Sequence, residues 1–134
     1  MKNEFEKNGS VLIVVVFAIA LLTAFVAGML QLNVEQIQLM RNEIYAAQAL
    51  AIAEAGIADA FSRLRSDSSW NDGFNGKSFG GGSYTVMVAG LPPDTNVIST
   101  GTSPQGFVAR VEAEITISGT SPYVIRIDKL RINE

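Results

Sequence analysis

The sequence predicts an α+β fold, in which a long N-terminal helix packs by its second half on a roughly four-stranded antiparallel sheet. Three observations predict it. An apolar run without charges begins at Val11 and passes into a segment with helical spacing, and no proline occurs before Pro92. Turn-forming residues break this pattern near residue 66. From Ser83 onward, apolar and polar residues alternate with the period of two that is typical of strands.

Five segments follow from these changes of pattern. They are a polar leader (1–9), an apolar half of the helix (10–32), an amphipathic half of the helix (33–65), a connecting loop (66–82) and the antiparallel sheet of a globular head (83–134). A chain of 134 residues suffices for one small domain. Because the apolar run takes part of that length, the core is small, and packing against neighbouring subunits would stabilise it.

The apolar half of the helix is long enough to cross a membrane. Residues Val11 to Leu30 read VLIVVVFAIALLTAFVAGML, and only Thr23 and Gly28 interrupt the apolar set. About 20 helical residues span about 30 Å, the thickness of the hydrocarbon layer. Lys2 and Lys7 precede the run, so we expect the N-terminus to lie in the cytoplasm.

The residues themselves fit two fates of this segment. Ala18-Ile19-Ala20 has the small-residue pattern of a secretory cleavage site, although the apolar run continues well beyond it. The segment can also serve as an uncut single-pass anchor.

The amphipathic half of the helix carries apolar residues at intervals of three and four. They are Val34, Ile37, Met40, Ile44, Ala47, Ala51, Ala55, Ala58 and Phe61. We expect one nearly continuous helix from about Val11 to Leu64, about 80 Å long. A domain of this size cannot bury such a helix. Its first half must therefore lie in lipid or in a bundle of identical helices, while its second half covers the sheet.

The connecting loop is rich in Gly, Ser, Asn and Asp. Its aromatic residues either pin the loop to the domain or present a contact surface; they are Trp70, Phe74 and Phe79. Its Asp67, Asp72 and Asn75 fit turns, and calcium ligation is the alternative, although their spacing is not that of an EF-hand.

Four strands are expected, at residues 83–90, 96–101, 106–119 and 123–132. The third alternates most regularly, which predicts one face made of Phe107, Ala109, Val111, Ala113, Ile115 and Ile117. The last strand has apolar residues on both faces, so it is expected to be central or partly covered.

The composition argues against catalysis, cofactors and nucleic acids. The chain has no cysteine and no histidine, which removes thiolate and imidazole chemistry, the usual zinc ligands and disulfides. The net charge is −3 and the basic residues are scattered among acids, so no phosphate-binding face is expected. Glu112 and Glu114 alternate with Arg110, which indicates a solvated strand face. We expect no enzyme, no cofactor and no metal site.

Two motifs resemble a known family. Lys7-Asn8-Gly9, followed by Ser10 and a long apolar helix, looks like the leader junction of type IV pilins and of the pseudopilins of type II secretion. The segment RNEIYAAQALAIAEAGIADAFSRL, Arg41 to Leu64, is similar to the corresponding segment of PilX-type minor pilins. The resemblance covers about the first half of the chain. It implies a third fate of the apolar segment: a prepilin peptidase cuts after Gly9 and N-methylates Ser10, which removes the leader and leaves the apolar helix on the mature protein.

One position departs from the family's pattern. Major pilins carry Glu at the fifth mature residue, which here is Val14. A carboxylate within an apolar helix implies a charged partner, and Val14 has no carboxylate. The resemblance therefore implies a minor pilin or pseudopilin rather than a main filament subunit. Its implied partners are other pilins, the prepilin peptidase and an inner-membrane assembly machine.

The implied location is first the inner membrane, with a single pass, and then an extracytoplasmic filament at the cell surface or in the periplasm. The alternatives are a membrane-tethered extracytoplasmic binding domain that does not polymerise and a secreted binding protein whose signal is removed.

Overall fold

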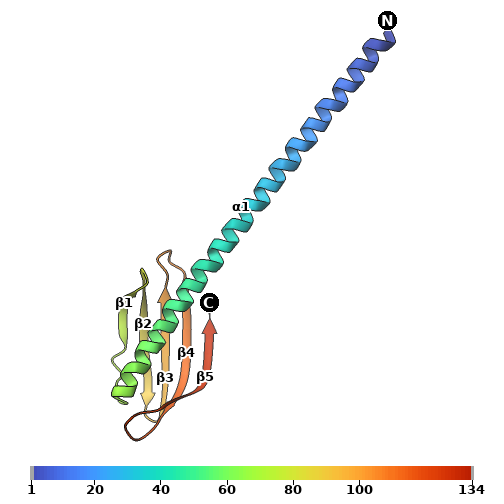
Figure 1. The fold of residues 1–134 in the computed structure, drawn as a ribbon. Helices are drawn as coiled ribbons and strands as arrows, with labels where there is room; N and C mark the ends of the chain where they lie inside the picture. Colours follow the sequence, from blue (N-terminus) through green and yellow to red (C-terminus); the bar gives the residue numbers. More distant parts are fainter. Residues whose placement is uncertain (1, 134) are drawn as a thin grey trace. The chain divides into compact units, whose positions relative to one another are not determined.

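The computed structural model describes residues 2–133 of the chain, and the side chains of residues 6–133. The helix α1 (Lys2–Ser66) is followed by five strands, β1 (Phe74–Phe79), β2 (Gly82–Leu91), β3 (Asp94–Thr102), β4 (Val108–Ile117) and β5 (Ile125–Asn133) (Figure 1). The expected α+β fold is confirmed. The chain divides into two compact units, with the boundary between Arg41 and Asn42. Of the predicted leader, Met1 and the side chains of residues 2–5, Lys2 included, lie outside the described residues.

The first unit is the N-terminal part of α1. The helix already begins at Lys2 and so includes the predicted leader, whereas the sequence predicted its start near Val11. Residues 2–9 contain no proline and include Glu and Lys, both good helix formers, so nothing in them ends the helix. The side chains described in this unit are exposed, except that Gly28 is half-buried.

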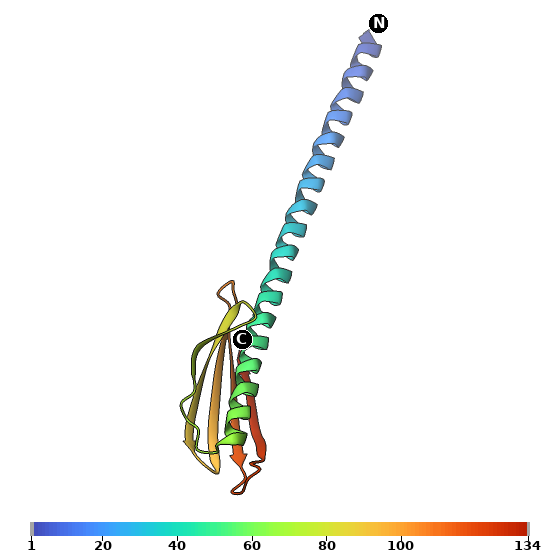
Figure 2. The same cartoon turned by 60° about the vertical axis from the view of Figure 1, so that its left-hand side comes forward.

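The second unit contains the core. Its part of α1 lies along one face of the sheet, as Figure 2 shows. The helix contributes Ile52, Ala53, Ile57, Ala60 and Leu64 to this core, and the sheet contributes Tyr84, Val86, Val97, Val111, Ala113, Ile115 and Ile117. The face predicted for the third expected strand is confirmed from Ala109 to Ile117, while Phe107 lies just before β4 and is half-buried.

The sheet is an antiparallel meander. The spatial order β1-β2-β3-β4-β5 is the order in the chain, so each strand pairs with the one before it. In the central pair Val97 lies opposite Ala113, and in the pair before it Val86 lies opposite Ser99. Residues opposite each other share a face of the sheet. These four therefore all point toward α1, and all four are buried.

One strand was not predicted. The expected loop 66–82 contains β1, which pairs with β2 and brings the number of strands to five. The two strands are joined at Gly80 and Gly81, whose φ angles are 57° and 81°. A tight hairpin requires a turn with positive φ at both central residues, and these two glycines supply it. Because Gly, Ser and Asn also fill β1 itself, the segment has the composition of a loop, and its pairing with β2 was missed.

The buried stripe of α1 also differs from the predicted one. Ala47, Ala51 and Ala58 of the predicted stripe are exposed, while the buried face runs through Ile52 and Leu64 on a neighbouring side of the helix. Alanine fits both a packed and an exposed helix face, so its spacing identified the wrong side. The larger Ile and Leu side chains determine which side is buried, because they gain most from leaving water.

Small residues allow the helix to lie close to the sheet. We call Ala49, Ala53 and Gly56 of α1, with Ser99 and Gly101 of β3, the small-residue seam. A Cβ on Gly56 would lie 2.3 Å from the Oγ of Ser99, and a Cβ on Gly101 would lie 2.4 Å from the carbonyl oxygen of Ala49. Both distances are far below van der Waals contact. The small residues of this part of α1 therefore serve close packing of the helix on the sheet.

Candidate functional site

The N-terminal part of α1 exposes apolar side chains on every side. Between Val11 and Leu32 the exposed fraction of the large apolar side chains ranges from 47% at Val15 to 71% at Ile13. Consecutive apolar residues point in all directions around a helix, so the surface is apolar all round. A helix of this kind is stable only in lipid or inside a larger bundle. By length and composition α1 can cross a membrane.

The one hydroxyl in this run is satisfied within the helix. The Oγ1 of Thr23 donates a hydrogen bond of 2.8 Å to the carbonyl oxygen of Ile19, one turn earlier. An unpaired hydroxyl is costly in an apolar environment, and this bond removes the cost. The polar interruption noted in the sequence is therefore compatible with lipid.

The predicted processing residues lie together on α1. Gly9 and Ser10 are exposed, and a Cβ placed on Gly9 meets no side chain among residues 6–133 within 4 Å. Val14 is 63% exposed. Because it follows Ser10 by four residues, it lies on the same side of the helix, one turn away. A carboxylate at this position would stand next to the amine of a chain that begins at Ser10, and valine leaves that place apolar.

The apolar surface continues past the predicted end of the first half. Val34, Ile37, Met40 and Ile44 are between 51% and 61% exposed, although the sequence predicted that this stripe covers the sheet. Packing on the rest of the domain begins only at Tyr45, whose ring lies 5.7 Å from that of Phe107. The sheet is shorter than the amphipathic segment, so the first dozen residues of that segment have no cover within the described chain. We call residues 11–44 the exposed helix surface.

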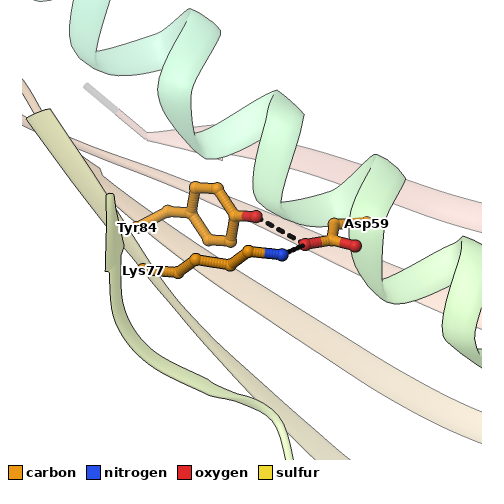
Figure 3. A network of polar contacts seen from close by, with 3 residues as sticks. All are labelled: Asp59, Lys77 and Tyr84. Atoms are coloured by element: carbon orange, nitrogen blue, oxygen red, sulfur yellow. Dashed lines mark hydrogen bonds and ion pairs between the residues drawn. The ribbon is translucent and has the colours of Figure 1, made fainter. Parts of the chain in front are cut away.

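A polar network joins the helix to the first hairpin (Figure 3). The carboxylate of Asp59 on α1 accepts a hydrogen bond of 2.5 Å from the hydroxyl of Tyr84 on β2. It also accepts a hydrogen bond from the Nζ of Lys77 on β1, with which it forms an ion pair. The Lys77 ammonium also lies over the ring of Phe74, 4.7 Å from its centroid. Sequence reasoning missed this network, because the three polar residues lie far apart in the chain.

The pKa values in this network favour packing over catalysis. The hydrogen bonds from Lys77 and Tyr84 lower the pKa of Asp59, and the bond to Asp59 raises the pKa of Lys77. Burial, followed by the bond to Asp59, raises the pKa of Tyr84. Each shift holds the group in its usual form at neutral pH. A general base or nucleophile requires the opposite shifts, so the network is suited to fastening α1 to the hairpin.

The aromatic residues of the expected loop are divided between the two roles predicted for them. Trp70 and Phe74 pack against the core, with their ring centroids 5.1 Å apart, and Phe74 makes an edge contact with Tyr84. They pin this segment to the domain. Phe79 remains 49% exposed at the end of β1, where it is available as a contact surface.

Of the polar residues singled out from the sequence, Asp67 forms a turn, and Glu112 and Glu114 form surface ion pairs. Asp72 is exposed and precedes β1, and Asn75 lies within β1 rather than in a turn. Asp67 accepts hydrogen bonds from the backbone nitrogen and the hydroxyl of Ser69, at 3.0 and 2.6 Å, as a turn-forming Asp does. Glu112 lies 3.8 Å from Arg110, and Glu114 lies 3.5 Å from Arg131. Among the side chains of residues 6–133, no three His, Cys, Asp or Glu gather in a way that could hold a metal ion.

Comparisons with protein-family models, with curated proteins and with solved structures find no match. The exposed helix surface, the predicted processing residues and the packed C-terminal unit are the features of the chain that bear on its function.

Proposed function

We propose that the chain is a minor pilin or pseudopilin, a structural subunit that takes part in the assembly of a type IV pilus or a type II secretion pseudopilus. The observation that carries the proposal is the exposed helix surface. It belongs to the same continuous helix whose C-terminal part packs on the sheet. A protein with this surface needs either lipid or other helices around it, and a filament subunit uses both in turn.

The first state is the membrane. The apolar residues from Val11 to Leu32 lie in the bilayer, with Lys2 and Lys7 on the cytoplasmic side. In water, side chains of this size would each lose about 1.5–3 kcal/mol relative to burial, so the segment does not leave lipid for solvent. The C-terminal unit, residues 42–134, lies on the extracytoplasmic side, and we call this whole unit the head.

The second state is the filament. The helix leaves lipid only for another apolar surface, and the same segment of neighbouring subunits supplies one. Val34, Ile37, Met40 and Ile44 extend that contact beyond the hydrocarbon region. The cut between Gly9 and Ser10 removes the charged leader, which would otherwise stand at the end of an apolar bundle. Because Val14 offers no carboxylate for a neighbour's amine, the subunit serves as a minor component.

The intact mass of the protein isolated from membranes tests the cut. We expect a mature chain that begins at methylated Ser10, and we expect Gly9→Val to leave the leader attached. Neither Gly9 nor Gly28 has a side chain of residues 6–133 within 4 Å of an added Cβ, so Gly28→Val is a control with the same change on the same helix. It should be processed normally. A start near Leu21, or an uncut chain, would overturn the pilin interpretation.

A second measurement separates a filament subunit from a tethered binding domain. Filaments sheared from cells that carry the wild type should contain the chain in small amounts relative to the main subunit, as measured by quantitative mass spectrometry. The Gly9→Val chain should remain in the membrane fraction. If the processed wild-type chain occurs only in membranes and never in filaments, the tethered domain is the better account.

A further inference from the structure

The strand β5 forms a free edge of the sheet. It is the last strand in the spatial order, and no strand within residues 2–133 pairs with its outer side (Figure 1). With nine residues it is longer than β1, the six-residue strand at the opposite edge. An edge strand presents a row of backbone N–H and C=O groups that another extended chain can pair with.

One face of β5 is apolar and lies on the helix side of the sheet. Its apolar residues pair with buried residues of β4: Ile127 with Ile115, Leu130 with Ala113 and Ile132 with Val111. The three β4 residues are at most 2% exposed, whereas the three β5 residues are 45–52% exposed. Cross-strand partners share a face, so Ile127, Leu130 and Ile132 continue the core face beyond the cover of α1. We call these three residues the β5 apolar strip.

The other face of β5 is basic. Lys129 lies opposite Glu114, and Arg131 lies opposite Glu112 and forms an ion pair of 3.5 Å with Glu114. Arg126 already has a partner, since its Nε lies 2.7 Å from the carboxylate of Asp128. Lys129 and Arg131 are therefore the two charges of β5 that face acids on the next strand. On the side of the free edge, the described chain offers them no such acids.

The strand β4 shows which sequence suits β5. In β4 apolar residues alternate with Glu112 and Glu114, so the apolar residues meet the β5 apolar strip and the acids meet Lys129 and Arg131. The free edge presents the same side chains to a strand on its other side. A second copy of β5 would instead place Lys and Arg opposite Lys and Arg, and like charges directly opposite destabilise a strand pair.

We propose that the free edge of β5 is a docking site for an extended segment of another protein, in which apolar residues alternate with Asp or Glu. The segment adds a sixth strand to the sheet. Its backbone pairs with β5, its apolar side chains cover the β5 apolar strip, and its carboxylates meet Lys129 and Arg131. This mode of recognition takes affinity from the backbone and specificity from alternate side chains. It does not depend on filament formation, because the edge exists in the single chain.

The test uses the full chain in detergent micelles and a labelled peptide with the β4 sequence VARVEAEITI as the probe. Fluorescence anisotropy measures binding. We expect saturable binding that the double variant Lys129→Gln/Arg131→Gln weakens about tenfold, and that added salt also weakens. Arg63→Gln/Arg65→Gln removes two exposed charges from the end of α1 and is the matched control, with unchanged affinity expected.

Two changes in the peptide test the mode of binding. Lysine in place of both of its glutamates should abolish saturable binding to the wild-type chain. N-methylation of alternate backbone nitrogens keeps the side chains and removes strand pairing, so it should abolish binding as well. Amide hydrogen exchange supplies an independent readout, since the unmodified peptide should slow exchange in β5 and leave β1 unchanged. Circular dichroism of each variant confirms that the head stays folded.

Several outcomes would overturn the proposal. The first is the absence of saturable binding below about 1 mM peptide. The second is binding of the N-methylated peptide as tight as that of the unmodified peptide. The third is a Lys129→Gln/Arg131→Gln variant that binds the peptide as tightly as the wild-type chain. Dimerisation of the free chain, seen by sedimentation and reversed by the peptide, would replace the acidic partner by a second copy. The intact-mass test of the proposed function is independent of all four outcomes.

Discussion

At the scale of the residue, Gly56 shows how close α1 lies to the sheet. A methyl group at this position would meet the Oγ of Ser99 at 2.3 Å and the ring of Tyr84 at 3.0 Å. Both neighbours are buried, at 0% and 3% exposure, so neither has free space beside it. The Ser99 hydroxyl also has no hydrogen-bond partner within the described chain. The packing there keeps an unpaired polar group, which costs stability.

These contacts predict a coupling between the two positions. Gly56→Ala should destabilise the head, because overpacking costs about 1–3 kcal/mol and exceeds the gain of about 1 kcal/mol in helix propensity. Ser99→Ala alone should be neutral or stabilising, since it removes the unpaired hydroxyl. In the double variant most of the cost of Gly56→Ala should disappear. Urea unfolding of the four chains measures the coupling energy.

The matched control for this cycle is Gly28→Ala, the same change on the same helix, where an added Cβ meets no atom within 4 Å. It should not lower the stability of the head. Additive effects of Gly56→Ala and Ser99→Ala would show that the two residues do not share the space that the structure assigns to them.

At the scale of the element, Asp59 connects α1 with the hairpin of β1 and β2. Its lowered pKa stabilises the head at any pH above the unfolded value of about 3.9, and this contribution is lost as the pH falls through the folded value. The raised pKa values of Lys77 and Tyr84 affect the stability of the head at the alkaline end of the pH range. Lys77 and Tyr84 stabilise the head fully below their unfolded pKa values of about 10.4 and 10, respectively. This stabilisation is lost as the pH rises through their folded pKa values.

Asp59→Asn should therefore reduce the dependence of stability on pH at both ends. We expect a lower melting temperature near pH 7 than in the wild type, and a smaller difference between the two chains near pH 2 and near pH 11. Near-UV circular dichroism during heating measures the melting of the head. Asp72→Asn removes an exposed carboxylate and should behave as the wild type. A constant difference from pH 2 to pH 11 would contradict the linkage.

The sequence predicted the elements unequally, and the reasons are physical. The period of two in β4 identified its position and its buried face from Ala109 to Ile117, because one side of the strand is packed and the other faces water, but the predicted strand was two residues too long at each end. The strand β1 has no such alternation, since five of its six residues are exposed. The alanine-rich part of α1 predicted a helix but not its buried side. For β5, the sequence predicted a central or partly covered strand with apolar residues on both faces. It is instead an edge strand, and the register shift between Glu114 and Ile115 places its apolar residues on one face, where they continue the core face beyond the helix.

Only part of the candidate site could be predicted from the sequence. Composition alone identified the apolar run from Val11 to Leu32, because no charged residue interrupts it. The length of the exposed helix surface was not predictable, since it depends on where the sheet ends relative to Tyr45. The Asp59 network could not be predicted either, because its three residues lie on three different elements and have no characteristic spacing in the sequence.

At the scale of the whole molecule, the core lies entirely in one of the two units. Every core residue lies between Ala49 and Ile117, after the boundary at Asn42. The N-terminal unit adds no buried side chain to it within the described residues. The head is therefore stabilised by its own packing, to which the N-terminal unit adds nothing within the described residues.

A chain of residues 42–134 should then fold without the N-terminal part and remain monomeric in water. Its near-UV circular dichroism should match that of the head in the full chain, and gel filtration should give the size of one copy. Leu64→Ala, at a fully buried position, should destabilise this shortened chain by about 2–5 kcal/mol, whereas Met87→Ala, at a position 64% exposed, should have little effect. A shortened chain without tertiary structure would contradict the separation.

The small-residue seam has a mechanical consequence. If α1 slid along the sheet by one turn, Ile52 or Ala60 would come to the place of Gly56 opposite Ser99, where no Cβ fits. The small-residue seam therefore hinders sliding of α1 along the sheet in both directions. A pull along the axis of α1 would load the helix and the sheet together, and the head would resist tension until its packing broke. Resistance to tension is thus built into the positions where α1 carries its smallest side chains.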